Sequence, residues 1–529
     1  MTLTTKSIKY IVLFVLLCVI SLLIVFRNDI ITGSTKNSAV NQSDQTKSIE
    51  PLNDSKTITV DLGKQTKNLD SNLICYNFNQ MFFTESDYTN QKITDAVKEL
   101  KPNLLRIPGG TMADSWDWDK GGVIDPKGFN FPANFKYEYG PGLIQQNYHS
   151  YQNVKNFLAK TNTKPLFVLN IITKNLDTQV AYLKSFQKIG VPIEYIEIGN
   201  EPYLFDNTLH PKADQYAKLA TEWNTRLKQE FPEAKIAYVA YSPNISNPRA
   251  IEKASTWNNS VSSVTGTPSA AFHIYTDTTT KNNSTSEIDG QNLRSLSNDD
   301  IKAGFATLNK KMSVHVSDEV SKIPSDKKLW ATEYNFVETG DRFIYAGTWA
   351  QGLFTTLNAT LLAQNPRYEI VCNHVLYGDT QWAAIFGSKN NSLGSQVSKQ
   401  SVSYNFSSGG QGLKMFGNAF KDADSLVNLE FKDNLKQISN GVEYPGLIGY
   451  KLSSGSEERF FILNLTDQQI SLDLSKLSTN ELTVNSVFSD PKKLILNNQD
   501  ISKNTYNTKN KIVKIEKYSI STILKSGVN

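Results

Sequence analysis

Two glutamates that follow apolar segments could form a pair of reactive carboxylates. Glu201 lies in YIEIGNEPYLF (residues 195–205), and Glu333 lies in KLWATEYNF (residues 328–336), 132 positions later. Cleavage of a glycosidic bond needs two carboxyl groups across a cleft. One protonates the leaving oxygen, and the other attacks the anomeric carbon or activates water. Ordinary strand-ending turns would also explain either glutamate alone, but two at strand ends favour a pair.

Other strand-like segments also end in polar side chains that could serve the same site: Arg106 in LLRI (104–107), Asn170 in PLFVLNI (165–171), and His273 with Tyr275 in AAFHIYT (270–276). Arg106 could keep a nucleophilic carboxylate ionised. It could equally neutralise Glu197, which by strand alternation shares the inward face with Glu201. For His273, a role in the core and a role in the site are both open.

Asn200 directly precedes Glu201, so strict alternation would send their side chains to opposite faces of a strand. Both can face a substrate only if the strand carries a bulge at this point. Gly199 would ease that distortion. We therefore expect an irregular backbone at residues 199–201.

Aromatic residues follow several of the same segments and could stack on the apolar faces of sugar rings. They are Trp116 and Trp118, Tyr203 and Phe205, and Trp382. Packing on the rim of the fold is the alternative role for these rings. Trp116 and Trp382 are the two that we predict to bind substrate.

Eight apolar segments alternate with helix-like ones between residues 72 and 377, which indicates a parallel sheet. They are 72–78, 104–107, 165–171, 195–201, 235–241, 270–276, 328–336 and 369–377. Eight such units predict an α/β fold of the (β/α)8 (TIM) barrel type, in which strand ends meet at one mouth. An open doubly wound sheet is the alternative, but its glycine-rich phosphate fingerprint is missing.

After about residue 425 the pattern changes to period-two alternation, which predicts an antiparallel β-sandwich. KTITVDLG (56–63) has one apolar face and precedes the first barrel segment, so we expect it to join the same sandwich. The predicted domains are an N-terminal segment (1–30), a flexible linker (31–55), a sandwich strand (56–68), a catalytic barrel (69–400) and a sandwich (401–529).

Residues 10–26, YIVLFVLLCVISLLIVF, are almost wholly apolar. Their length is near the lower limit of about 17–25 residues for a membrane helix. The lack of a small-residue cleavage pattern favours an uncleaved anchor over a signal peptide. Lys6 and Lys9 favour a cytoplasmic N-terminus. We therefore expect an exported protein that is anchored in the cell membrane, or secreted if the segment is cleaved.

Composition excludes some partners and cofactors. The formal net charge is only +4, from 55 basic and 51 acidic residues, so we expect no nucleic acid partner. The five histidines lack metal-type spacing, so we expect no metal and no cofactor. Cys75 and Cys372 fall on the first and eighth barrel strands, which a closed barrel makes neighbours. Since bridging depends on register, we expect two buried free thiols.

Several motifs together carry a resemblance to a known group of enzymes. GNEP on the fourth strand, a strand-end glutamate on the seventh and RIPGG on the second resemble clan A of the retaining glycoside hydrolases. The likeness is closest to the α-L-arabinofuranosidase and heparanase-like (endo-β-glucuronidase) families and spans residues 56–529. Two segments depart from those families: TEYN replaces the usual DEWN, and Ile274 lies between His273 and Tyr275.

The resemblance implies a role for each matching residue. Glu201 would be the acid/base and Glu333 the nucleophile. Asn200 would contact the hydroxyl next to the anomeric carbon, Tyr275 would lie near Glu333, and Arg106 beneath it. The expected partner is an oligo- or polysaccharide. An inactive carbohydrate-binding barrel at the cell surface and a metal-dependent hydrolase are the alternatives. The sugar, the linkage and the oligomeric state stay open.

Overall fold

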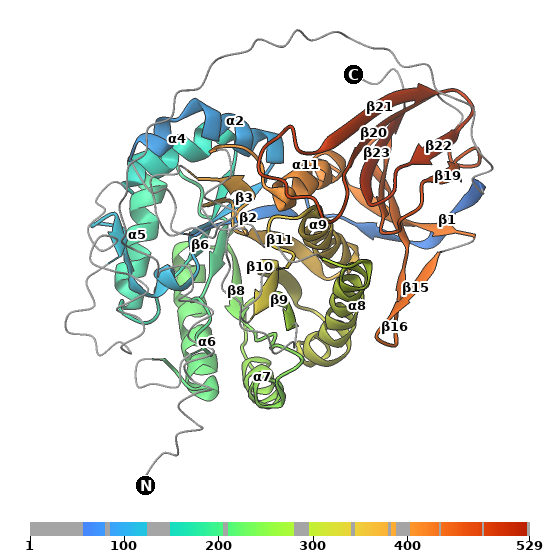
Figure 1. The fold of residues 1–529 in the computed structure, drawn as a ribbon. Coiled ribbons are helices and arrows are strands. Elements are labelled where there is room, and N and C mark those ends of the chain that lie inside the picture. Colours follow the sequence, from blue (N-terminus) through green and yellow to red (C-terminus); the bar gives the residue numbers. More distant parts are fainter. Residues whose placement is uncertain are drawn as a thin grey trace, which may run out of the picture.

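The computed structural model describes residues 57–79, 85–123, 149–204, 210–279, 296–339, 344–378, 382–387, 403–432, 435–478 and 481–525. The chain forms a helix-covered barrel with a strongly curled β-sheet beside it (Figure 1). The predicted anchor and linker lie outside the described residues. Within the described residues, no helix is long and apolar enough to cross a membrane.

Eight parallel strands close the barrel, as the alternation of segments predicts, so the fold is not an open sheet. In chain order they are β2 (Ile74–Asn79), β3 (Leu104–Gly109), β6 (Lys164–Val168), β7 (Tyr195–Glu197), β8 (Lys235–Val239), β9 (Ser269–Thr279), β10 (Lys328–Thr339) and β11 (Tyr368–His374). Each expected strand segment overlaps one of them. Their apolar side chains pack inside the barrel on one face and against the helices on the other.

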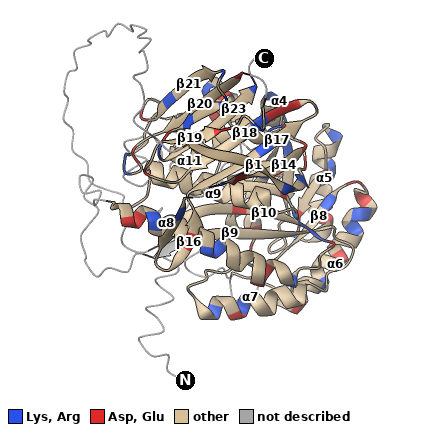
Figure 2. Cartoon of the chain, turned by 90° about the vertical axis from the view of Figure 1, so that its right-hand side faces the viewer, with Lys and Arg blue, Asp and Glu red and all other residues tan. Residues whose placement is uncertain are grey.

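Eight α-helices are described, and most surround the barrel: α2 (Gln91–Leu100), α4 (Tyr151–Thr161), α5 (Leu176–Lys188), α6 (Ala213–Glu230), α7 (Pro248–Val261), α8 (Asn298–Val314), α9 (Trp349–Gln364) and α11 (Ser408–Phe420). Side chains define several helix ends. The Asn90 side chain accepts from the Lys92 N–H at the start of α2, and Lys101 ends that helix in the left-handed conformation. Basic and acidic residues are interspersed along α6 and α7 (Figure 2).

Short elements connect the longer helices and strands. A π-helical turn at His315–Glu319 and a 3-10 turn at Val320–Lys322 follow α8. Two further 3-10 turns are η1 (Glu85–Thr89) and η2 (Thr111–Ser115). Three small ladders pair β4 (Trp116–Asp117) with β5 (Gly122–Val123), β12 (Tyr377–Gly378) with β13 (Ile385–Phe386), and β15 (Lys436–Ser439) with β16 (Val442–Pro445).

The second part is a sheet of nine hydrogen-bonded strands in the order β21-β20-β23-β18-β17-β14-β1-β19-β22. Their bounds are β1 (Thr57–Asn68), β14 (Ser425–Phe431), β17 (Leu447–Ser454), β18 (Glu457–Asn464), β19 (Ile470–Asp473), β20 (Leu482–Phe488), β21 (Ser502–Thr508), β22 (Ile512–Ile515) and β23 (Ser519–Lys525). The sheet curls until its end strands meet, where the Tyr506 hydroxyl on β21 accepts from the Lys514 N–H on β22 at 2.6 Å. Apolar side chains from both ends fill the space between.

The first strand of the chain belongs to this sheet, as its one-sided apolar pattern predicts. β1 pairs antiparallel with β14 and parallel with β19. Its Ile58 and Val60 are buried in the same core as Phe460 and Leu472. The barrel is therefore built from the chain between β1 and the remaining eight strands.

The expectation of two free thiols is wrong, because Cys75 and Cys372 form a disulfide. The register pairs Cys372 of β11 directly with Cys75 of β2, and both side chains lie in the apolar core inside the barrel. Their Cα atoms are only 4.0 Å apart. The sequence fixes which strands are neighbours but not their register, and register decides whether two cysteines can be bridged.

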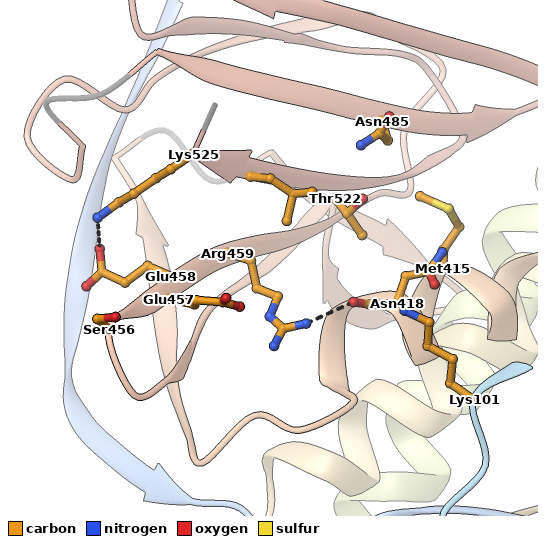
Figure 3. Close-up of a pocket in the computed structure, with 11 residues that line it drawn as sticks. Lys101, Met415, Asn418, Ser456, Glu457, Glu458, Arg459, Asn485, Thr522 and Lys525 are labelled. Atoms are coloured by element: carbon orange, nitrogen blue, oxygen red, sulfur yellow. Dashed lines mark hydrogen bonds and ion pairs between the residues drawn. The ribbon is translucent and has the colours of Figure 1, made fainter. Parts of the chain in front are cut away.

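A polar cavity of about 310 Å3 lies where the sheet meets the barrel helices (Figure 3). Arg459 extends into it from β18 and donates to the Asn418 carbonyl on α11 at 3.2 Å, and Lys525 pairs with Glu458 at 2.7 Å. None of the strand-end residues predicted from the sequence lines this cavity.

A buried lysine joins the two parts on another side. Lys67 on β1 is 7% exposed, and its ammonium group donates to the main-chain oxygens of Ala363, at the end of α9, and Tyr368, at the start of β11. Burial, with a further contribution from the charge of Lys328, lowers the pKa of Lys67 to about 7. The folded protein therefore holds this proton less tightly than the unfolded chain does.

This difference predicts how stability depends on pH. Below pH 7 both states are protonated and the cost of burying the charge is present in full. Between pH 7 and about 10.4 the unfolded chain binds one more proton at this site than the folded protein, so Lys67 adds stability as pH rises. The difference in melting temperature between the wild type and Lys67→Met should increase in favour of the wild type from pH 6.5 to pH 9. A pH-independent difference would contradict this prediction.

Candidate active site

The carboxyl ends of the barrel strands bring together most of the predicted site residues and two that were not predicted. The cluster contains Asn77 from β2, Arg106 from β3, Glu197 from β7, Asn200 and Glu201 just beyond it, His273 and Tyr275 from β9, Glu333 from β10, and His374 from β11. All of these side chains are buried except those of Glu201, Tyr275 and His374, which are partly exposed. The cluster is therefore a polar layer above an apolar barrel core.

Arg106 lies at the centre of this layer and is fully buried. Its Nε donates to Glu197 Oε2 at 2.6 Å, and its Nη1 donates to Glu333 Oε1 at 2.7 Å. Its Nη2 donates to Asn200 Oδ1 at 2.9 Å. Burial disfavours the charge of Arg106, but the carboxylates of Glu197 and Glu333 outweigh burial and raise the pKa of Arg106. Arg106 therefore contacts both Glu197 and Glu333 and does not pair with one of them alone.

Glu333 is surrounded by hydrogen-bond donors. Its Oε1 also accepts from Asn77 Nδ2 at 2.8 Å, and its Oε2 accepts from the Tyr275 hydroxyl at 2.5 Å. Burial would raise the pKa of this carboxyl, but His273 and Arg106, with the hydrogen bond from Tyr275, hold it well below its ordinary value. Glu333 is therefore a carboxylate anion in a nearly dry site.

Glu201 has a different environment. Its side chain is 16% exposed, which gives it access to solvent. Its Oε1 accepts from the Tyr203 hydroxyl at 3.1 Å and lies 3.0 Å from His273 Nδ1. The ring of Tyr203 is stacked on Tyr241, with centroids 4.0 Å apart, which fixes the position of that hydroxyl. The Glu333 carboxyl is thus enclosed among donors, and the Glu201 carboxyl is partly accessible to solvent.

His273 connects the two carboxyl groups. Its Nδ1 lies 3.0 Å from Glu201 Oε1 and 3.5 Å from Glu333 Oε2. These two oxygens can therefore be no more than 6.5 Å apart, the sum of the two distances. Burial opposes a charge on His273, but the carboxylates of Glu333 and Glu201 raise its pKa to about 10.

Irregular backbone aims both carboxyl groups at the site. Gly199 has φ +90° and Glu201 has φ +42°, so the chain leaves β7 in the left-handed region and Asn200 and Glu201 both reach the cluster. On β10 the pairing with β9 shifts between Ala331 and Glu333. The extra residue, Thr332, donates to Glu197 Oε1 at 2.9 Å. The register shift on β10 is a bulge of the kind that re-aims a side chain, and the left-handed backbone at residues 199–201 is the irregularity that the sequence predicts.

Two predicted substrate-binding residues do not join the cluster. Asn170 Oδ1 accepts from the Ile172 and Thr173 N–H groups, and its Nδ2 donates to the Trp116 carbonyl at 3.1 Å. The ring of Trp116 is 2% exposed and packs between Trp118 and His149. Both residues hold the loops that follow β3 and β6.

Trp382 lies between β12 and β13, and its carbonyl accepts from the Val375 N–H, just after β11, at 3.3 Å and from Asn335 Nδ2 at 3.4 Å. Its side chain is partly exposed, as a platform for a sugar ring requires. Phe205, another candidate aromatic, lies outside the described residues.

Three residues near the site were not predicted from the sequence. Asn77 and His374 end the first and eighth strands, so the strand-end rule that selected Glu201 could have found them. Asp114, on the η2 turn, is fully buried and is bonded by the Asn200 N–H. Burial, and then the nearby charge of Glu201, raises the pKa of Asp114 well above its ordinary value. No pattern in the sequence distinguishes Asp114 from a surface aspartate.

Known proteins resemble this chain in structure but do not match it in sequence. No protein-family model matches the chain. No curated protein matches it in sequence.

Solved structures match almost the whole chain. An α-L-arabinofuranosidase from Thermotoga maritima has a TM-score of 0.63 and 16% identity over 88% of this chain and 99% of its own. A family 51 α-L-arabinofuranosidase from Bifidobacterium longum has a TM-score of 0.65 and 12% identity, over 88% of this chain and 98% of its own. A 4-O-α-L-rhamnosyl-β-D-glucuronidase from Fusarium oxysporum 12S has a TM-score of 0.56 and 13% identity, over 89% of this chain and 100% of its own. At such identities the likeness establishes the barrel-plus-sheet fold.

Proposed function

We propose that this chain is a retaining glycoside hydrolase that cleaves a glycosidic bond in a plant, glycan or exopolysaccharide substrate. The observation that carries the proposal is the placement of Glu201 and Glu333 on either side of His273 Nδ1, at 3.0 and 3.5 Å. Retaining enzymes hold their two carboxyl groups about 5–5.5 Å apart, and inverting ones about 6.5–9.5 Å. The two nearest carboxylate oxygens are at most 6.5 Å apart, which is compatible with the retaining arrangement.

Glu333 is the nucleophile in this proposal. Its carboxylate attacks the anomeric carbon as the bond to the leaving oxygen breaks, and a covalent glycosyl-enzyme forms. A nucleophile must be ionised at the start, and Arg106 and His273 keep Glu333 so. Tyr275 holds one carboxylate oxygen through its hydroxyl.

Glu201 is the acid/base. It gives its proton to the leaving oxygen in the first step, and in the second step it removes a proton from the water that releases the sugar. Its partial exposure suits both steps, because the leaving group and the water must each reach it from the open side.

Asn200 supplies a donor for the sugar. Its Oδ1 is engaged by Arg106, while its Nδ2 is buried and has no hydrogen-bond partner in the described part of the chain. A buried amide without a partner is costly. A sugar hydroxyl next to the anomeric carbon would satisfy it. We assign substrate binding to Asn200, Tyr275, His273 and Trp382, and support of the nucleophile to Arg106.

The substrate class follows from the neighbours by analogy. Two of them are named as α-L-arabinofuranosidases and one as a rhamnosyl-glucuronidase. Arabinofuranosides and uronic acid glycosides are therefore the first candidates. No contact in the described site favours the inactive carbohydrate-binding alternative.

The place of action in the proposal is outside the cytoplasm. The apolar segment at residues 10–26 motivates it. The Cys75–Cys372 disulfide supports it, because disulfides persist in oxidising compartments.

A screen with stereochemical readout tests the function. The protein is incubated with aryl arabinofuranosides, glucuronides, xylosides and glucosides, and the first-formed sugar is observed by proton NMR. We expect turnover of at least one class with retention of anomeric configuration. Inversion would contradict the double displacement. Absence of turnover on all aryl glycosides and on oligosaccharides would contradict the function itself.

A further inference from the structure

Asn77 and His374 form a second contact with Glu333, from β2, the strand next to Arg106 on β3, and from β11 on the other side of β2. Asn77 Nδ2 lies 2.8 Å from Glu333 Oε1 and 2.9 Å from His374 Nδ1. His374 Nδ1 is also 3.6 Å from Glu333 Oε2. The register of β11 and β2 pairs His374 directly with Asn77, so the two side chains and the carboxylate form a compact triangle.

The chemistry of these groups fixes where the protons lie. A carboxylate can only accept, so the Asn77 atom next to Glu333 must be the amide nitrogen. That nitrogen carries two hydrogens, and the second points to His374 Nδ1. His374 Nδ1 must therefore accept, and its ring proton lies on Nε2. Burial lowers the pKa of His374, in keeping with a neutral ring.

The same contacts distinguish the two oxygens of the nucleophile. Oε1 accepts from both Arg106 Nη1 and Asn77 Nδ2. Oε2 accepts from the Tyr275 hydroxyl and faces His273. Since Oε1 is held by two donors, Oε2 is the oxygen with a lone pair left for attack.

Gly109, in the RIPGG segment, makes room for this arrangement. A Cβ atom at position 109 would lie 1.5 Å from Asn77 Oδ1 and 2.6 Å from Asn77 Cγ. Gly109 is not among the residues with positive φ, so its backbone conformation would accept alanine. Position 109 must therefore be glycine to leave space for the Asn77 amide, and not because the backbone conformation requires it.

The disulfide joins the next pair of inward-facing residues on β2 and β11, below Asn77 and His374. Cys75 and Cys372 precede Asn77 and His374 by two positions on the same strands, and the register pairs them in the same way. Side chains two residues apart on a strand share a face. The covalent link therefore fixes the spacing of the two strands directly beneath the Asn77 and His374 side chains.

We propose that Asn77 and His374 are positioning residues that orient Oε2 of Glu333 for attack, with Gly109 and the Cys75–Cys372 disulfide holding the pair in place. The expected effect on kcat rests on the proposed function. The predicted tautomer of His374 does not depend on that function.

Four variants of the full chain test the kinetic consequence: Asn77→Ala, Gly109→Ala, the double variant, and Gly409→Ala as the matched control. A Cβ at Gly409 meets its nearest neighbour, Thr355, at an ordinary 3.6 Å. We expect kcat on the best aryl glycoside to fall about 100-fold in Asn77→Ala, as for a misplaced reacting group, with KM nearly unchanged. Gly109→Ala should fall similarly, and the double variant should be no worse than Asn77→Ala alone, because both remove the same contact. Gly409→Ala should match the wild type.

Two further readouts separate positioning from general damage. Asn77→Asp places a second carboxyl beside Glu333 and should move the acidic limb of the kcat/KM profile to higher pH. Replacing both cysteines by alanine should lower kcat by about 10-fold, a smaller loss than the roughly 100-fold cost of a misplaced reacting group, again with little effect on KM. Unchanged kcat in Asn77→Ala, or losses that multiply in the double variant, would overturn the proposal.

Nitrogen-15 spectra of histidine-labelled protein give the independent test. The wild type should show His374 with its proton on Nε2, and Asn77→Ala should lose that fixed tautomer. If the wild type hydrolyses no glycoside, the proposed function fails and the spectra alone decide the contact. A wild-type His374 that is protonated on Nδ1 would overturn the inference even in an active enzyme.

Discussion

Glu333→Gln is expected to abolish hydrolysis of every glycoside, with kcat at least about 10,000-fold below the wild type. The amide is neutral and cannot form the covalent glycosyl-enzyme. The loss should be the same whatever the leaving group, because a good leaving group still needs a nucleophile. Rates are compared on a natural-type aryl glycoside and on one with a highly acidic phenol.

Glu201→Gln provides the contrast. A very good leaving group departs without a proton, so this variant should keep part of its activity on the acidic phenol and lose far more on the poor leaving group. Each variant replaces one carboxylate oxygen by an amide nitrogen of nearly the same size. Glu201→Gln and Glu333→Gln are therefore steric controls for each other. Equal losses of the two variants on the acidic phenol would show that the roles are wrongly assigned.

Replacing Arg106 by methionine should cost both activity and stability. The change leaves Glu197 and Glu333 buried without their shared cation. Breaking a buried ion pair by removing one partner typically costs about 3–5 kcal/mol. We expect a loss of that size in the free energy of unfolding and no measurable turnover, because Glu333 loses a donor that keeps it ionised.

Arg226→Met is the matched control, because Arg226 pairs with Glu230 at 2.6 Å on α6 but is 44% exposed. Exposed pairs contribute about 0–1 kcal/mol, so this variant should melt close to the wild type. Arg106→Met combined with Glu197→Met removes one of the stranded charges. It should recover part of the stability and none of the activity. Equal melting temperatures for Arg106→Met and the wild type would contradict the central role of Arg106.

The sequence predicts the barrel well because the signal is local. Strands buried on both faces and helices with one apolar face repeat eight times, and each repeat indicates its own element. The rule that active sites lie at strand ends then selects Glu201, Glu333 and Arg106 without any distance information. The positive φ at Gly199 also follows locally, since Asn200 and Glu201 can share a face only through a bulge.

What the sequence could not predict depends on contacts between distant segments. The cysteines form a disulfide because the register aligns β2 with β11, which neither strand encodes alone. Asn170 has the residue type for sugar binding, but nearby loop groups already occupy its side-chain atoms. Gly109 is part of a recognisable motif, yet a glycine is needed there because the Asn77 side chain, 32 positions earlier in the sequence, occupies the space of a Cβ atom.

Helix α11 shows the same limit in another form. SGGQGLKMFGNAF is rich in glycine, which disfavours a helix by roughly 1 kcal/mol per residue relative to alanine. The structure explains the glycines by close approach, since a Cβ at Gly412 would lie 2.0 Å from Thr356 Oγ1 on α9. Local propensity is overridden by packing, and packing is not visible in one sequence.

The place of β1 in the sheet has a mechanical consequence. A pull on the residues before Thr57 enters the folded part through this strand, which lies between β14 and β19 and bonds to both. Force along a strand loads the hydrogen bonds of both ladders together in shear, so they resist as a group and do not open one at a time. The barrel strands begin only after β1 ends at Asn68. Tension on the N-terminal side is therefore carried by the sheet before it reaches the strands that hold the carboxylates.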